Sequence, residues 1–272
     1  MSEKTAKIIR NIILVIFGIS FLVPFIIMIT GAFIDAKIPV GSPFLWLKTH
    51  EITLNNFRHI FKYSQILRWL VNSIIISVIP TVLQMFFAAI LGYVFARKDF
   101  FGKEILFWSM MAVVMVPTQV LIIPRYIMFS GFNLVNKRAA LILPAVWSIM
   151  GVFLVKQFMA QLPKSLEESA KIDGASDMKI FFSIMLPLSK PVIATVGTFA
   201  FISAWNDFLT PLIFTTSSEM YPITVGLASL LTKEGNFGIE MAGALLSFIP
   251  TFLIFLFFQK YFTKGIAFTG VK

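Results

Sequence analysis

The feature that most constrains this chain is a series of apolar runs that are nearly free of charged residues. A helix of roughly 20 apolar residues spans the ~30 Å hydrocarbon core of a bilayer, and a soluble domain has no means of covering several such helices. The runs predict an all-α polytopic membrane protein with six transmembrane helices in a single domain, residues 1–272. The predicted spans cover residues 11–34, 69–96, 105–128, 139–158, 191–214 and 241–260.

The composition excludes the main alternatives to a membrane protein. Hydrophobic residues make up 58% of the chain and charged residues 13%, whereas a soluble domain carries about 25% charged residues. A soluble enzyme is therefore excluded, and so is a disordered chain, which would be poor in apolar residues. The chain has no cysteine, so it has neither disulfides nor a thiolate metal site.

Lysine and arginine predict the orientation in the membrane. Six spans put both termini on one side, and with the termini inside, the inner segments hold 14 basic residues and the outer segments 8. This bias favours cytoplasmic termini. It also accounts for the +10 net charge without a nucleic-acid partner, because the basic residues are spread between the apolar runs. The large segments outside the bilayer are then a cytoplasmic loop, 159–190, and two outer loops, 35–68 and 215–240.

Sequence motifs for catalysis are missing. The chain has no HExxH zinc motif, no GxSxG elbow and no GxxxxGK[ST] phosphate loop. We therefore predict no catalytic residue, no metal site and no cofactor. An ion-coupled carrier normally needs intramembrane charges, yet Asp207 is the only acidic residue inside a predicted span, and Arg125 lies at a span's edge. A secondary carrier and a membrane enzyme remain weaker alternatives, and a partner is expected to supply the energy for transport.

The cytoplasmic loop contains signals for two short helices. Ser165 followed by Glu168 predicts a capping box at the start of the first helix. Gly174 is suited to the positive φ that often ends a helix, and Ser176 can cap a second helix running to Leu186. The loop is therefore expected to hold a cytoplasmic helix with one side free for docking.

The same loop carries the motif of a known family. The motif residues are Glu168-Ser169-Ala170 and Asp173-Gly174-Ala175, followed by Phe181, Ile184, Leu186, Pro187 and Pro191. They resemble the EAA loop of binding-protein-dependent ABC importer permeases, and Ser169 is the only departure, standing where the family usually has alanine. Segments 53–57, 67–77, 141–146, 204–214 and 221–230 look like the carbohydrate branch of that family, the maltose-permease type.

The resemblance implies a fold, a function and a set of partners. The fold is that of a type I ABC importer permease in a prokaryotic cytoplasmic membrane. The implied function is translocation of a carbohydrate, driven by ATP that a separate ATPase subunit hydrolyses. The implied partners are a second permease subunit in a heterodimer, an ABC ATPase dimer that contacts the EAA helix, and an extracytoplasmic solute-binding protein. A permease for another solute, such as a polyol, glycerol phosphate or an amino acid, remains the alternative.

Three groups of residues are candidates for function. Coupling to the ATPase is assigned to Glu168, Ser169, Ala170, Asp173, Gly174 and Ala175, although Glu168 can also serve only to stabilise its helix. The translocation pathway is assigned to Asn72, Gln84, Gln119, Asn206 and Asp207, although intramembrane amides often just bond neighbouring helices. Contact with the binding protein is assigned to a flexible, glycine-flanked tip of the second outer loop, which can equally be a plain solvated loop: Gly235, Asn236, Phe237 and Gly238.

Overall fold

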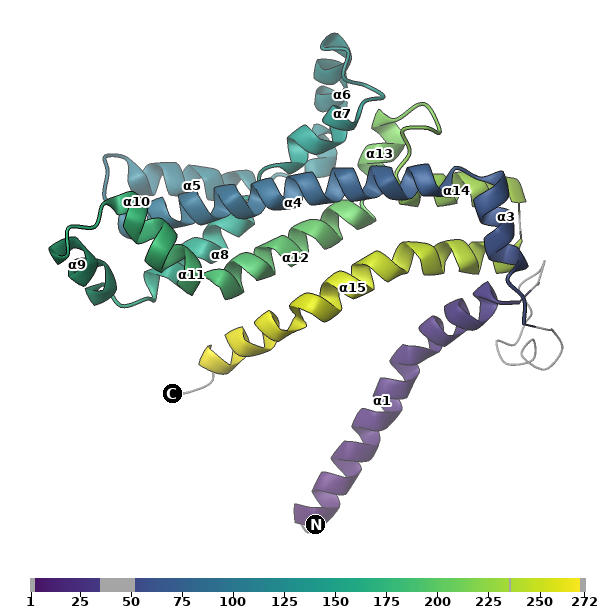
Figure 1. The fold of residues 1–272 in the computed structure, drawn as a ribbon, viewed down its shortest axis with the longest axis horizontal. Helices are drawn as coiled ribbons and strands as arrows, with labels where there is room; N and C mark the ends of the chain where they lie inside the picture. The colour runs from purple at the N-terminus through teal and green to yellow at the C-terminus, as the bar shows by residue number, and fades with distance from the viewer. Residues whose placement is uncertain (1–2, 35–51, 235, 270–272) are drawn as a thin grey trace. The chain divides into compact units, whose positions relative to one another are not determined.

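The computed structural model describes residues 3–34, 52–234 and 236–269 (Figure 1). In these ranges all regular structure is helical, apart from one isolated antiparallel bridge between Ile34 and Ile52. The predicted all-α fold is therefore confirmed. Among the described residues, four helices are long and apolar enough to cross a membrane, or up to six if each of two bent helix pairs forms one span.

The described residues form a series of helices along the chain. Their bounds are α1 Glu3–Ala32, α3 Asn55–Tyr63, α4 Ile66–Arg97, α5 Lys103–Val113, η1 Thr118–Leu121, α6 Ile122–Gly131, α7 Arg138–Ile142, η2 Leu143–Ala145, α8 Ile149–Ala160, α9 Ser165–Ile172, α10 Asp177–Ile180, the π-helix η3 Phe181–Met185, α11 Leu186–Leu188, α12 Lys190–Asn206, α13 Leu209–Phe214, α14 Ile223–Glu234 and α15 Phe237–Thr269.

The chain forms two compact units. The first consists of Met1–Leu67 and Gly226–Ile249, and the second of Arg68–Val225 and Pro250–Lys272. In the first unit, large apolar side chains of α1 are exposed, among them Leu14, Phe17 and Phe21, with exposed fractions of 62%, 59% and 71%. A helix that is apolar and yet uncovered fits a lipid environment, since a soluble protein rarely exposes so much apolar surface.

The first unit also fixes the start of α15. Asn56, which is buried, donates from its side-chain amide to the backbone carbonyls of Ala32 and Ile34, at 3.1 and 2.7 Å. Gly238 lies against this contact, and a Cβ at this glycine would meet the Ile34 carbonyl and the Asn56 amide. Only glycine fits there without displacing these groups.

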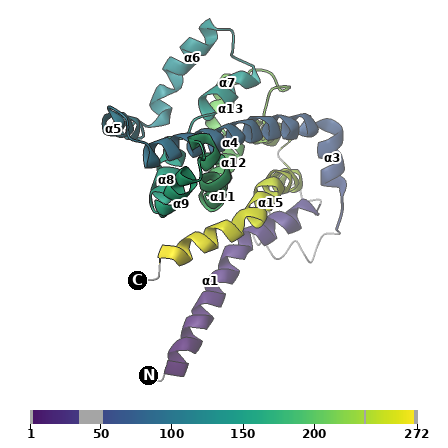
Figure 2. The same ribbon diagram turned by 60° about the vertical axis from the view of Figure 1, so that its left-hand side comes forward.

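The second unit is built around α4, with α8 and α12 alongside it (Figure 2). One buried cluster lies toward the Arg97 end of α4 and includes Tyr93, Phe107, Val155, Met185 and Val196, from α4, α5, α8, η3 and α12. A second, smaller cluster packs α4 against α6, α7 and α13 through Ile76, Phe129, Ala140, Leu141 and Phe214. The two clusters hold the helices of this unit at both ends.

Three predicted spans are not continuous helices. The run at 139–158 is divided into α7, η2 and α8, with residues 146–148 outside any helix. The run at 105–128 is divided into α5, η1 and α6, with a bend of 85° between Lys103–Val113 and Thr118–Gly131. Pro117 falls at this break, where it lacks the N–H that would continue the helix. The run at 191–214 stops at Asn206 and resumes at Leu209.

Proline chemistry also explains the break between Asn206 and Leu209. In an unbroken helix the carbonyl of Asp207 would accept from residue 211, but Pro211 has no N–H to donate. The Asp207 carbonyl instead accepts from the Thr224 hydroxyl at 2.9 Å. The two predicted outer loops contain helices too: α3 lies in 35–68 and α14 in 215–240.

Candidate functional site

Several helices of the second unit surround a polar cavity of about 370 Å³. Its walls come from α4, the η1–α6 segment, η2, α12 and α13. The polar residues that line it are Gln84, Thr118, Gln119, Arg125, Ser203, Asn206, Asp207 and Thr210. Four of the five residues predicted for the translocation pathway therefore lie around one cavity.

Two helix breaks, one after α12 and one after η2, position two of these polar groups. Asp207 has an extended backbone between α12 and α13, and its carboxylate accepts from the Thr210 amide at 3.2 Å. Gln84 donates from its side-chain amide to the Ala145 carbonyl, at the end of η2 where the chain leaves helical hydrogen bonding. Interrupted helices thus supply the polar side chains and backbone groups of the cavity, as is typical where irregular backbone borders a wet space within a membrane protein.

A second cavity, of about 400 Å³, shares Gln84, Ala200 and Ser203 with the first. Its other walls include Trp147 from the turn before α8 and Phe199 from α12. One face of α12 therefore borders both cavities, with aromatic groups near the second and charged or amide groups near the first. Apolar walls with a few polar groups are the usual make-up of a small-molecule site.

Asn72, the fifth residue predicted for the pathway, does not line this cavity. Its side chain is fully buried. It donates to the carbonyls of Glu219 and Tyr221 at 2.8 and 2.9 Å, and it accepts from the Arg138 guanidinium at 2.8 and 3.0 Å. All of its hydrogen-bonding capacity is used within the chain, so Asn72 holds α4, α7 and the segment after α13 together.

The segment 159–190, predicted to be a cytoplasmic loop, contains the short helices α9 and α10, which are joined at Gly174. Gly174 has a φ of +77°. Its amide donates to Lys171 at 3.0 Å, and the Ala175 amide donates to Ala170 at 2.9 Å. This pair of hydrogen bonds is a Schellman motif, in which the residue with positive φ is normally glycine. The predicted helix end at Gly174 is confirmed, and so is the cap at Ser176, whose hydroxyl accepts from the Lys179 amide.

The predicted capping box is wrong. α9 begins one residue earlier, with Lys164 at the N-cap and no side-chain cap. The Glu168 amide donates to the Lys164 carbonyl at 3.1 Å, so it is not available to the Ser165 hydroxyl. Glu168 and Ser169 are exposed, and Ala170 packs against the buried cluster.

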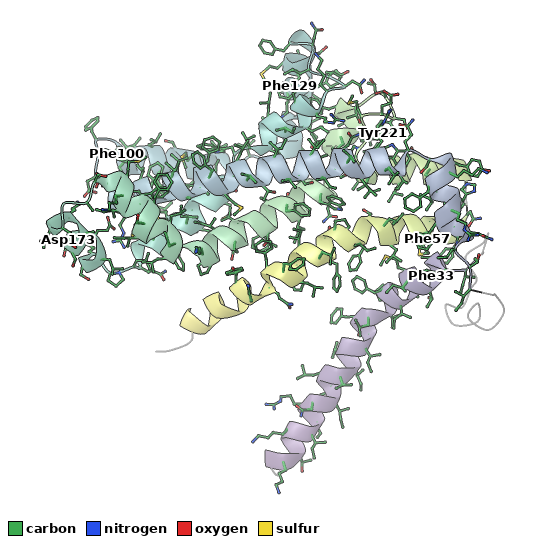
Figure 3. All side chains as sticks on the ribbon, viewed as in Figure 1. Phe33, Phe57, Phe100, Phe129, Asp173 and Tyr221 are labelled. Carbon is green, nitrogen blue, oxygen red and sulfur yellow. The ribbon has the colours of Figure 1, made fainter. Side chains whose placement is uncertain are left out.

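The turn between α9 and α10 lies at an extremity of the second unit, at the end of α4 opposite Tyr221 (Figure 3). Asp173 is exposed at this turn, and its carboxylate makes no hydrogen bond or ion pair within the described part of the chain. Beside it, Ile172 is 87% exposed and Met178 66% exposed. The turn thus presents apolar side chains next to an acidic group. Ala175 is half-buried and packs against the cluster beneath.

Sequence reasoning missed a buried ion pair beneath α9. Glu167 lies next to the predicted Glu168 but on a different face of the helix, and only 11% of its side chain is exposed. Its carboxylate lies 3.0 Å from Nε of Arg97, whose side chain is 4% exposed. The sequence feature that could have indicated a buried Glu167 is its helical spacing from Ala170: residues three apart lie on the same face of a helix.

The residues predicted to contact a binding protein do not form a flexible tip where the structure describes them. Gly235 lies outside the described residues. The Asn236 side chain accepts from the Ile239 amide at 3.3 Å, and Phe237 and Gly238 belong to the first turn of α15. Gly238 is buried against Asn56, so the prediction of a mobile, protruding loop is wrong for this part.

Known proteins resemble the chain over most of its length. It is 38% identical to the arabinooligosaccharides transport system permease protein of Halalkalibacterium halodurans over 223 residues, 81% of this chain and 80% of that protein. It is 31% identical to the polygalacturonan/rhamnogalacturonan transport system permease protein of Bacillus subtilis over 275 residues, 95% of each chain. A chain of a bacterial ABC transporter involved in the import of the acidic polysaccharide alginate has a similar fold. The TM-score is 0.79 at 20% identity, covering 96% of this chain and 99% of that one.

A family of membrane proteins matches the part of the chain that holds most of the cavity lining and the α9–α10 segment. Residues 86–268 match the family described as the binding-protein-dependent transport system inner membrane component. The matched range is more than half of the chain and includes the motif from Glu168 to Pro191. The chain therefore belongs to the family of binding-protein-dependent transport system inner membrane components and is a multi-pass protein of the inner membrane.

Proposed function

We propose that the chain is a permease subunit of an ATP-driven ABC importer that translocates a carbohydrate, with α9 as the contact for a partner ATPase. Family membership supports the importer. The carbohydrate is supported by the names of relatives, which include permeases for arabinooligosaccharides and for melibiose, raffinose and stachyose. Several relatives with different saccharide names align with this chain, so the proposal is limited to the class of solute.

The exposed turn between α9 and α10 carries this proposal. A side chain such as Ile172, 87% exposed next to a carboxylate, gains stability when a protein partner covers it. The Schellman turn holds this surface in a defined orientation. The exposed acids Glu168 and Asp173 can accept hydrogen bonds from basic groups of the partner, whereas Ala170 and Ala175 anchor the turn from beneath.

The cavities along α12 support a route for a polar solute. Sugar hydroxyls both donate and accept hydrogen bonds, and amides such as Gln119 and Asn206 can do the same in return. We propose that Gln84, Gln119, Asn206 and Asp207 contact the solute on its passage. Asn72 is not included, because its hydrogen bonds are satisfied within the chain.

The orientation and the partners complete the proposal. The excess of basic residues in the inner segments supports cytoplasmic termini, with the α9–α10 turn on the cytoplasmic side. A second permease subunit then pairs with this chain, an ATPase dimer contacts the cytoplasmic side, and a solute-binding protein delivers the sugar from outside. The chain itself has no phosphate-binding loop, so we do not expect it to hydrolyse ATP.

Cysteine cross-linking tests the proposed contact directly, because the chain contains no cysteine of its own. Ile172→Cys introduces a single thiol at the turn, and Ile127→Cys introduces a matched thiol on α6, where Ile127 is 67% exposed. In membranes that contain the complete transporter, we expect a reagent with one thiol-reactive and one photoreactive group to link the Ile172→Cys chain to the ATPase subunit and to leave the Ile127→Cys chain unlinked. Equal linking of both chains, or of neither, would contradict the contact.

Reconstitution tests the source of energy. The complete transporter in liposomes is expected to accumulate an oligosaccharide only with ATP and binding protein present. The chain alone is expected neither to hydrolyse ATP nor to accumulate the sugar. Concentrative uptake by the chain alone, driven by a sodium or proton gradient, would support an ion-coupled carrier instead.

A further inference from the structure

Arg97, the last residue of α4, has a side chain that is buried beneath α9. Its Nε lies 3.0 Å from a carboxylate oxygen of Glu167, and the two side chains are 4% and 11% exposed. A buried arginine must be paired, because an uncompensated charge in a low-dielectric site is strongly destabilising. Within the described residues of this segment, Glu167 is the acidic side chain that meets this requirement.

Arg97 contacts the α9 segment at two points. Besides the Glu167 carboxylate in the first turn of α9, its Nη2 donates to the carbonyl of Leu162, just before α9 begins. The Leu162 contact is a directed hydrogen bond, whereas the Glu167 contact is an ion pair in which the Nε–H makes no hydrogen bond, so the guanidinium holds the start of α9 at two places. α9 is therefore fixed relative to the end of α4 by one side chain.

The other half of the connection is α4 itself. Gln84, which borders both cavities, lies on the same helix 13 residues before Arg97, or about 20 Å along the axis. Pro80 is the only proline in α4, and it lies on the far side of Gln84. Between Gln84 and Arg97 the helix is unbroken, and it is packed into the buried cluster through Ala88, Ala89 and Tyr93. A displacement of its Arg97 end is therefore carried to Gln84 as movement of a rigid element.

We propose that Arg97 is a positioning residue that connects movement of α9 to the cavity through α4, with Glu167 as its partner. This inference rests on the proposed function, because it takes α9 to be the element that the ATPase moves. It assigns roles to Arg97 and Glu167, which are not among the exposed acids of the motif. Glu168 faces the partner, and Glu167, next to it in sequence, faces the membrane domain.

A neighbouring ion pair provides the natural comparison. Lys98 pairs with Asp177 of α10, but these side chains are 27% and 60% exposed. Exposed pairs contribute little to stability, since water and salt screen them. The covalent path from α10 through α11 to α12 is a second possible route for the movement. If that route is sufficient, the Arg97 contact will be dispensable.

The experiment uses the complete transporter in proteoliposomes and measures solute molecules transported per ATP hydrolysed. In one variant, Arg97→Met and Glu167→Met are combined, because apolar residues of similar volume often replace a buried ion pair without loss of the fold. Arg97→Lys keeps the charge opposite Glu167, and Lys98→Met is the matched control at the next residue. Retention of the ATPase subunit during purification reports assembly in each case.

We expect the double Met variant to assemble and to lose about tenfold in transport per ATP, as for a typical coupling between two sites. Arg97→Lys should keep much of the ratio, and Lys98→Met should match the wild type. A wild-type ratio in the double Met variant would overturn the inference, and so would failure of this variant to assemble, since the pair would then be only a folding requirement. A wild-type complex without ATP-dependent uptake would instead refute the proposed function.

Discussion

Replacing Gly174 isolates the role of the α9–α10 turn, because the cost of the change can be worked out from the backbone. Gly174 has a φ of +77°, and a Cβ added there would meet no atom within 4 Å. The cost of Gly174→Val is therefore conformational and not steric. A β-branched residue in the left-handed region is disfavoured by roughly 1–2 kcal/mol.

The chain has two ways to respond to this strain. It can keep the turn and remain strained, or it can leave the left-handed region and lose the two hydrogen bonds of the Schellman motif, each worth about 0.5–1.5 kcal/mol. The less costly response disfavours the native orientation of α9 by about 1–2 kcal/mol, a factor of about 5–30 in its population. Gly174→Asn should cost less, since asparagine tolerates this region, and Gly174→Ala should fall between asparagine and valine.

The assay is uptake and binding-protein-stimulated ATPase activity of the complete transporter in liposomes. We expect both activities to fall together in the order Asn, Ala, Val, while the amount of chain in the membrane stays normal. Gly102→Val is the matched control, because Gly102 has a φ of +78° and is equally free of neighbours, but it lies in the turn before α5. Wild-type transport with Gly174→Val, or an equal loss with Gly102→Val, would refute the reasoning.

Four further predictions concern single side chains or a pair of them. Asp173→Ala should weaken coupling mildly and without loss of stability, because the carboxylate is exposed; salt added to the wild type should mimic part of this effect in ATPase assays. Asn72→Leu should lower the thermal stability of the purified complex, since it leaves buried groups unpaired at about 1–3 kcal/mol each. Gln119→Ala should instead raise the apparent KM for uptake and leave the thermal stability unchanged. The hydrogen bond from Lys98 lowers the pKa of the Asp177 carboxyl. The ion pair should therefore be fully formed above the ordinary carboxyl pKa of about 3.9 and be lost as the pH falls through the lowered value. An Asp177 pKa at or above the ordinary value, measured by NMR titration of labelled aspartates, would contradict this.

The sequence was informative where local chemistry decides the structure. Apolar length predicted the long helices, because a lipid environment leaves few alternatives for a chain of this composition. Gly174 and Ser176 predicted the helix end and the following cap, since both depend on residues close in sequence. The breaks at Pro117 and Asp207 were harder to predict, because proline within a membrane helix often causes only a kink. At Asp207 the break also depends on a hydrogen bond from Thr224, 17 residues away.

Distant contacts decide the roles of polar side chains, and here the sequence was insufficient. Asn72 and Gln84 are both amides on α4, and their sequence context does not distinguish them. Arg138 and two backbone carbonyls engage Asn72 completely, whereas Gln84 keeps one side toward the cavities. The difference arises from helices that come together only in the folded chain.

The adjacent acids of α9 are a second case in which the sequence does not distinguish the roles of two side chains. Glu167 and Glu168 differ by one position, which rotates them by about 100° around the helix. That rotation places Glu167 against Arg97 and leaves Glu168 exposed. The motif residue is thus the one available to a partner, and its neighbour is the one held by the membrane domain. The proposed contact of α9 with an ATPase requires both kinds of contact, because a helix bound on only one side could move without moving anything else.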